Sequence, residues 1–147
     1  MKNTILLIAG VVITLLFVAL PASVFETLYY EREFSNEMYN QGLYLTVAIV
    51  TVVVAWGSAG LYYYVINSVS FSRWYHWLIV LIVASVGTAV INYAYPSSIF
   101  SEEGLDFSGQ LFSFCVVNLV LEAVLFVVAS FSIRWWSSNC RHTPIPE

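Results

Sequence analysis

Charged residues are scarce in this chain: Asp, Glu, Lys and Arg make up 10% of its 147 residues, whereas hydrophobic residues make up 60%. Soluble domains usually have about 25% charged residues. A soluble fold with so few would expose large apolar patches to water. The five Lys and Arg residues form no cluster, and this excludes a basic surface for nucleic acid.

Cysteine and histidine are also rare. Cys115 lies inside a long apolar run and Cys140 lies near the C-terminus, so we expect no disulfide between them. His76 and His142 lie outside the apolar runs, which excludes a pair of facing histidines around a membrane-embedded haem. The sequence contains no Gly-rich phosphate loop, HExxH motif or intramembrane Ser/His/Asp set. We therefore predict no catalytic residues, no cofactor and no metal site.

Four long apolar runs dominate what is present. Each has the roughly 17–25 residues that a helix needs to cross a bilayer. We therefore predict an all-α polytopic membrane protein, with four transmembrane helices in an antiparallel bundle. The predicted spans cover residues 4–25, 43–66, 77–95 and 111–133.

The first run raises the question of a signal peptide, because it follows Lys2. The run is longer than the apolar region of a signal peptide. Leu20 and Pro21 also stand where a cleavage site needs small residues. We interpret the run as a membrane helix, with Pro21 near its far end.

The charges predict an orientation, because Lys and Arg near span ends mark the cytoplasmic side. Arg32 alone falls on the other side of a four-span topology. We predict that both termini are cytoplasmic and that the membrane is a bacterial inner (plasma) membrane. Residues 1–136 then form the transmembrane domain and residues 137–147 a short cytoplasmic tail. The basic residues on the cytoplasmic side are Lys2, Arg73, Arg134 and Arg141.

Glu122 is the ionisable residue that falls inside a predicted span, close to the middle of the bilayer. Burial away from water disfavours a charged carboxylate, so we expect the neutral acid. Asn118 and Cys115 precede it by one and two turns, and Ala129 continues the same helix face. We expect this polar stripe to face other helices or a water-filled cavity.

Polar residues at similar depth on the other spans are candidate partners for the stripe. In a structural interpretation, Glu122 and Asn118 hydrogen-bond across helices and fix their packing. In a functional interpretation, Glu122 is a proton or cation site in a conduction path. The candidate partners are Ser58, Ser85, Thr88 and Asn92, with Trp56 and Thr14 near the same level.

The two loops on the side opposite the termini are acidic. Tyr29, Tyr30, Phe34 and Met38 recur at roughly helical spacing, which predicts a short amphipathic helix in the first loop. The acids serve solubility and topology, or form a cation-attracting mouth or a surface for an external partner. This predicted outer acidic cap contains Glu26, Glu31, Glu33, Glu37, Glu102, Glu103 and Asp106.

The last residues, 137–147, contain two prolines and are expected to form a disordered end, as chain termini commonly do. The tail and the connection between the second and third spans are candidate contacts for a cytosolic protein.

These features favour a non-enzymatic membrane protein: an oligomeric sensor, anchor or immunity and phage-defence subunit, acting through protein partners in the bilayer. We expect a homo-oligomer or a membrane-complex subunit that binds no nucleic acid. The alternative is an oligomeric ion channel or a proton-coupled small-solute transporter that uses Glu122.

Overall fold

The computed structural model describes residues 1–146, and this part of the chain is all-helical with no strand. The α-helices are α1 (Lys2–Ala19), α2 (Pro21–Leu28), α3 (Arg32–Asn40), α4 (Leu43–Gly60), α5 (Trp74–Glu102) and α6 (Ser108–Ile133). A π-helix, η1 (Leu61–Ile66), extends α4, and short 3₁₀ turns follow at η2 (Val69–Phe71) and η3 (Arg134–Trp136).

Four helical segments are long and apolar enough to cross a membrane. They are Lys2–Ala19, Leu43–Ile66, Trp74–Glu102 and Ser108–Trp136. The all-α class and the presence of four such helices are therefore confirmed.

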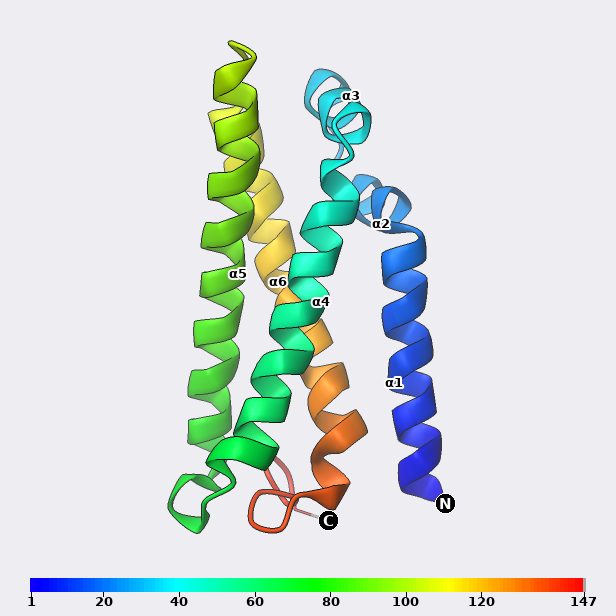
Figure 1. The fold of residues 1–147 in the computed structure, drawn as a ribbon, viewed down its shortest axis with the longest axis vertical. Helices are drawn as coiled ribbons and strands as arrows, with labels where there is room; N and C mark the ends of the chain where they lie inside the picture. Colours follow the sequence, from blue (N-terminus) through cyan, green and yellow to red (C-terminus); the bar gives the residue numbers. More distant parts are fainter. Residues whose placement is uncertain (147) are drawn as a thin grey trace.

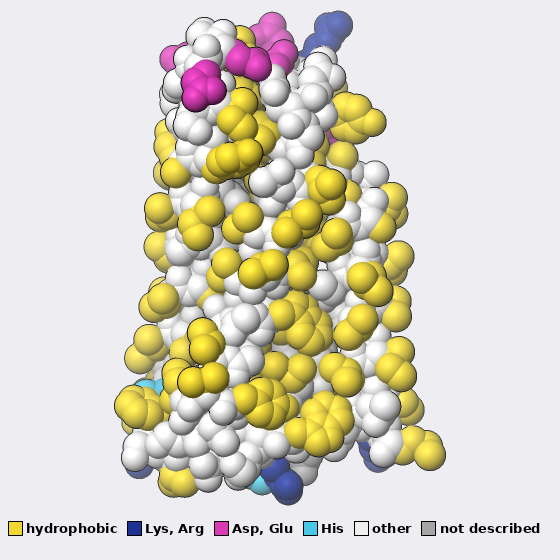
Figure 2. Space-filling view, viewed as in Figure 1, with side chains coloured by type: hydrophobic (Ala, Val, Ile, Leu, Met, Phe, Trp, Pro, Cys, Tyr) yellow, Lys and Arg dark blue, Asp and Glu magenta, His cyan; other side chains and the backbone are white. Residues whose placement is uncertain are grey.

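The long helices lie side by side, with α4, α5 and α6 packed on one another and α1 packed against α4 and α6 (Figure 1). Both termini lie at one end of the molecule, which we call the termini end, and α3 lies at the opposite end, the α3 end. Acidic side chains gather at the α3 end, and hydrophobic side chains cover the length between the two ends (Figure 2).

The first helix is shorter than the predicted 4–25. Helix α1 ends at Ala19, and Leu20 leaves the helical conformation with φ −126° and ψ 52°. Pro21 then begins α2, because a residue before proline is disfavoured in the helical region while proline itself fits the first helical turn. The break that we expected to be tolerated at Pro21 therefore divides the segment into two helices.

The third helix is longer than predicted, and the stop that we placed at Pro96 is wrong. Helix α5 continues through Pro96 to Glu102. Proline removes one backbone hydrogen-bond donor. A helix continues past it when the other backbone hydrogen bonds remain and neighbouring helices pack around the proline. Pro96 is buried in this structure. With this extension, Asn92 lies ten residues before the end of α5 instead of three residues before the end of the predicted span.

The second predicted run, 43–66, coincides with α4 and η1 together. The fourth begins at Ser108 rather than at residue 111. Asp106 Oδ1 accepts hydrogen bonds from Ser108 N at 3.3 Å and from Ser108 Oγ at 3.0 Å, so polar groups hold this helix start.

Two clusters of buried aromatic residues close the interior. At the α3 end, Phe25 and Phe114 have ring centroids 4.9 Å apart, and Phe34 of α3 packs edge-on against Phe107 at 5.8 Å. At the termini end, Trp77 packs against Phe126 at 5.4 Å. Between these clusters lies the polar part of the interior.

Helix α1 contacts α6 closely at Gly10. A Cβ atom at this position would lie 1.9 Å from Ser132 Oγ and 2.9 Å from Ser132 Cβ. The Ser132 hydroxyl is held in place, because it donates to Val128 O at 2.6 Å. Glycine is therefore required at this crossing.

Candidate functional site

The α6 stripe lies inside the molecule. Asn118, Glu122 and Ala129 have no exposed surface, and Cys115 is 6% exposed. Their spacing of three, four and seven residues keeps them on one helix face, which packs against α4 and α5. The stripe therefore presents its polar atoms to neighbouring helices.

At the level of Asn118, the three inner helices are joined by a closed set of hydrogen bonds. Asn118 Nδ2 donates to Thr51 Oγ1 of α4 at 2.9 Å, and Asn118 Oδ1 accepts from Asn92 Nδ2 of α5 at 3.0 Å. Asn92 Nδ2 also lies 3.5 Å from Thr51 Oγ1, and the Thr51 hydroxyl donates to Val47 O at 2.7 Å. We call Thr51, Asn92 and Asn118 the amide layer.

One turn further along α6, the Glu122 carboxyl has a different environment. Both of its oxygens are buried without a hydrogen-bond partner, as are the hydroxyls of Thr88 and Ser85. The Thr88 hydroxyl lies beside the carboxyl, but no bond of good geometry joins them. We call Glu122 and Thr88, together with Ser85 almost one turn further along α5, the carboxyl layer.

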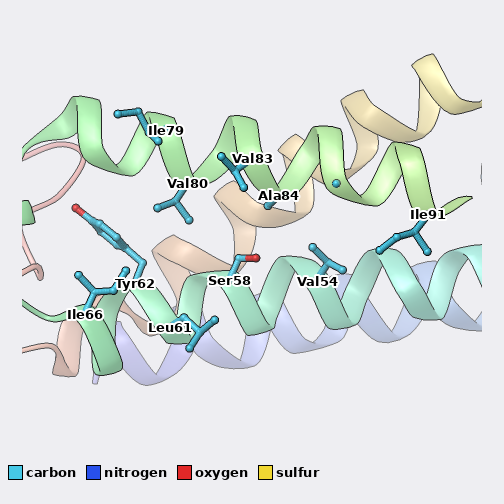
Figure 3. A pocket seen from close by; sticks show the side chains of 11 residues that line it. Val54, Ser58, Leu61, Tyr62, Ile66, Ile79, Val80, Val83, Ala84 and Ile91 are labelled. Atoms are coloured by element: carbon cyan, nitrogen blue, oxygen red, sulfur yellow. The ribbon is translucent and has the colours of Figure 1, made fainter.

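Three of the four predicted partners, Ser85, Thr88 and Asn92, thus lie in these layers. The fourth, Ser58, does not. Ser58 is half-buried and lines a lateral groove of about 390 Å³ between α4 and α5. Figure 3 shows its side chain in this groove, together with Val54 of α4 and Val83 of α5. Trp56 Nε1 donates to Thr14 Oγ1 at 3.0 Å, so this pair links α4 to α1.

Thr51 was missed by the sequence analysis. Counting depth from a third span that ends before Pro96 places Asn92 nearer the outer end than Asn118, although it is among the predicted partners of the stripe. With α5 extended to Glu102, Asn92 lies well inside the helix, at the level of Thr51 and Asn118. Counting from the correct helix end would have aligned all three.

A second polar cluster lies at the termini end, where the C-terminal tail meets the connection between α4 and α5. Asn67 Oδ1 accepts from Ser137 Oγ at 2.9 Å and from Asn139 N at 3.0 Å. Asn67 Nδ2 donates to Ser138 Oγ at 2.9 Å, and Asn67 O accepts from Asn139 Nδ2 at 2.6 Å. Asn67 therefore holds the start of the tail.

The rest of the described tail is also packed, so the expectation of a disordered end is wrong for residues 137–146, while residue 147 lies outside the described residues. The Tyr63 hydroxyl donates to Thr143 O at 2.7 Å, and Arg134 Nη1 donates to Ile145 O at 2.8 Å. Cys140 has no exposed surface, and burial raises the pKa of its thiol. A network of side-chain to backbone bonds holds the tail in a single conformation.

The acidic residues of the predicted cap lie in α2, in α3 and around the connection between α5 and α6. Glu31 caps α3, since its Oε2 accepts from Phe34 N at 2.8 Å. Glu103 Oε1 accepts from Gln41 Nε2 at 2.6 Å and so links the two loops. These two acids have structural partners at the surface.

Residues 1–146 contain no group of three or more His, Cys, Asp or Glu side chains that could hold a metal ion. No family model matches the chain, and no curated protein or solved structure matches it either.

Proposed function

We propose that the chain is a non-enzymatic integral membrane protein that works as a subunit, bound laterally to further copies of itself or to other membrane proteins. Support for the location comes from the four long apolar helices and from acidic charge gathered at one end. Lys2, Arg73 and Arg141 near the termini end favour a cytoplasmic position for that end.

The observation that carries the proposal is the groove between α4 and α5. It opens sideways, because Val83 and Ile91 on its rim are 66% and 48% exposed, and its lining is almost entirely apolar. Gly87 lies in this groove, and a Cβ atom added at this position would have no heavy atom within 4 Å. Small residues at such a place let a helix from another chain approach closely.

Filling the groove tests the proposal. Gly87→Leu adds a side chain at a position where a Cβ atom meets no heavy atom within 4 Å, and the larger side chain fills part of the groove. Val90→Leu is the matched control, since Val90 is exposed on α5 and does not line the groove. We expect native mass spectrometry in detergent or nanodiscs to show wild type and V90L in complexes and G87L as a monomer. A wild type that is monomeric without any bound protein contradicts the proposal.

The alternative, an oligomeric channel or proton-coupled transporter, is favoured by the unpartnered carboxyl of Glu122. Reconstituted liposomes distinguish the two functions. A laterally bound subunit produces no ion flux. Flux that Glu122→Gln abolishes would replace the subunit proposal with the transport function.

A further inference from the structure

Four buried oxygen atoms without partners are concentrated in the carboxyl layer. They are both carboxyl oxygens of Glu122 and the hydroxyls of Thr88 and Ser85, in residues that are 0%, 0% and 2% exposed. Buried polar atoms in folded proteins almost always have a partner, in the protein or in a bound water or ion. A set of four such oxygens is therefore unusual and requires an explanation.

The amide layer fixes the positions of these oxygens. The hydrogen bond between Asn92 and Asn118 sets the register of α5 against α6, which run in opposite directions (Figure 1). Thr88 lies four residues before Asn92, and Glu122 lies four residues after Asn118, so both lie one turn towards the termini end. The Thr88 hydroxyl accordingly lies beside the carboxyl, and Ser85 follows on the same face of α5.

The third inner helix supplies no polar group at this level. Ala55 and Ala59 follow Thr51 at intervals of four residues on α4, and both are fully buried. Their methyl groups occupy little volume and form no hydrogen bonds. The oxygens of the carboxyl layer must therefore be satisfied by something other than α4.

No charge in residues 1–146 balances the carboxyl. The Thr88 hydroxyl is the polar group beside it, and no charged group acts on it. The titratable groups on the surrounding elements lie further away. Cys115 is two turns along α6, and Tyr62 and Tyr63 lie in η1, in the other direction. A carboxylate in the membrane interior is costly without a neutralising cation.

We propose that Glu122, Thr88 and Ser85 form a site for one monovalent cation, either a proton or Na⁺, which neutralises the carboxyl between α5 and α6. The donor set contains only oxygen, which suits hard cations, and its single carboxylate matches a single positive charge. A proton bound to Glu122 would let the acid donate to Thr88 Oγ1. Na⁺ would instead accept electron pairs from the carboxylate and hydroxyl oxygens. Such a site is independent of lateral association through the α4–α5 groove.

Infrared difference spectroscopy tests the site directly. The protein in liposomes is titrated from about pH 5 to about pH 9, a range in which exposed Asp and Glu are largely ionised. The titration is done in choline chloride and in NaCl, and subtraction of Glu122→Gln isolates the carboxylic acid band of Glu122. We expect this band to disappear as the pH rises. If Na⁺ is the ligand, the band disappears at lower pH in NaCl, whereas a proton site gives the same titration in both salts.

Two further variants separate a site from an isolated acid. We expect Thr88→Val or Ser85→Ala to shift the proton or Na⁺ concentration at half-conversion by about tenfold, as loss of a supporting ligand does in other ion sites. Ser98→Ala is the control, because Ser98 is exposed on the same helix near its other end. A band that stays constant across the whole range in both salts, or hydroxyl variants that titrate as wild type does, overturns the proposal.

Discussion

Asn118 and Glu122 lie one turn apart on α6 and are equally buried, yet the amide has two inter-helix hydrogen bonds and the carboxyl has none. The difference comes from the helices opposite. At the first level α4 and α5 supply Thr51 and Asn92, whereas at the second level α4 supplies Ala55. A buried polar residue in a span therefore does not indicate its role by itself. Whether it joins helices or is free to bind a ligand depends on the polar side chains that the neighbouring helices supply at the same level.

The largest effect is expected from breaking the amide layer. Asn118→Leu removes the donor to Thr51 and the acceptor for Asn92, and leaves Asn92 with a weakened set of partners. We expect the free energy of unfolding to fall by about 1–3 kcal/mol, the cost of leaving buried polar groups unsatisfied. Thermal or denaturant unfolding in a fixed detergent measures it. Val120→Leu, at an exposed position of α6, is the control and should stay within about 0.5 kcal/mol of wild type.

Replacement of Glu122, one turn away, by leucine should raise the free energy of unfolding or leave it almost unchanged. Glu122→Leu removes two oxygens that have no partner and adds an apolar side chain of similar volume. In sodium-free buffer near neutral pH, we expect a change within about 1 kcal/mol or a gain in stability, because replacing unsatisfied buried polar atoms is neutral or favourable. A loss as large as that of N118L would mean that Glu122 joins helices as Asn118 does.

The smallest effect on stability is expected at the termini end, where water can replace lost hydrogen bonds. Asn67 has a left-handed φ of 32°, so Asn67→Gly removes its side-chain bonds to the tail without straining the backbone. We expect the free energy of unfolding to change by less than about 1 kcal/mol.

The sensitive measurement for this variant is the labelling rate of Cys140. This thiol is fully buried with a raised pKa, so a water-soluble maleimide should react slowly with wild type and several-fold faster with N67G. Asn40→Gly, at an exposed position at the α3 end, should leave the rate unchanged. Equal rates in N67G and wild type would show that Asn67 does not hold the tail.

Much of the interior could be predicted from the sequence, because periodicity within one helix is a local property. The spacing of Cys115, Asn118 and Glu122 places them on one face, and the structure buries all three. Four spans follow from the lengths of the apolar runs alone. Thr88 and Asn92 were named as partners because depth can be counted along a span.

The remaining features depend on contacts between distant segments. Asn92 is recognised as lying at the level of Thr51 and Asn118 only when α5 is known to pass through Pro96. The tail folds onto Asn67 through bonds that span about seventy residues of sequence, and no periodicity marks them. The composition of residues 137–146 is typical of a free end, although their backbone and hydroxyl groups find partners in the α4–α5 connection.

The break at Leu20 also has a consequence for the surrounding lipid. With 18 residues, α1 is about 27 Å long, slightly less than a typical hydrocarbon core of about 30 Å. The 29 residues of α5 extend to about 43 Å. In a bilayer, α1 would be shorter and α5 longer than the hydrocarbon core, a mismatch that local thinning of the bilayer, tilting or projection of the helix accommodates.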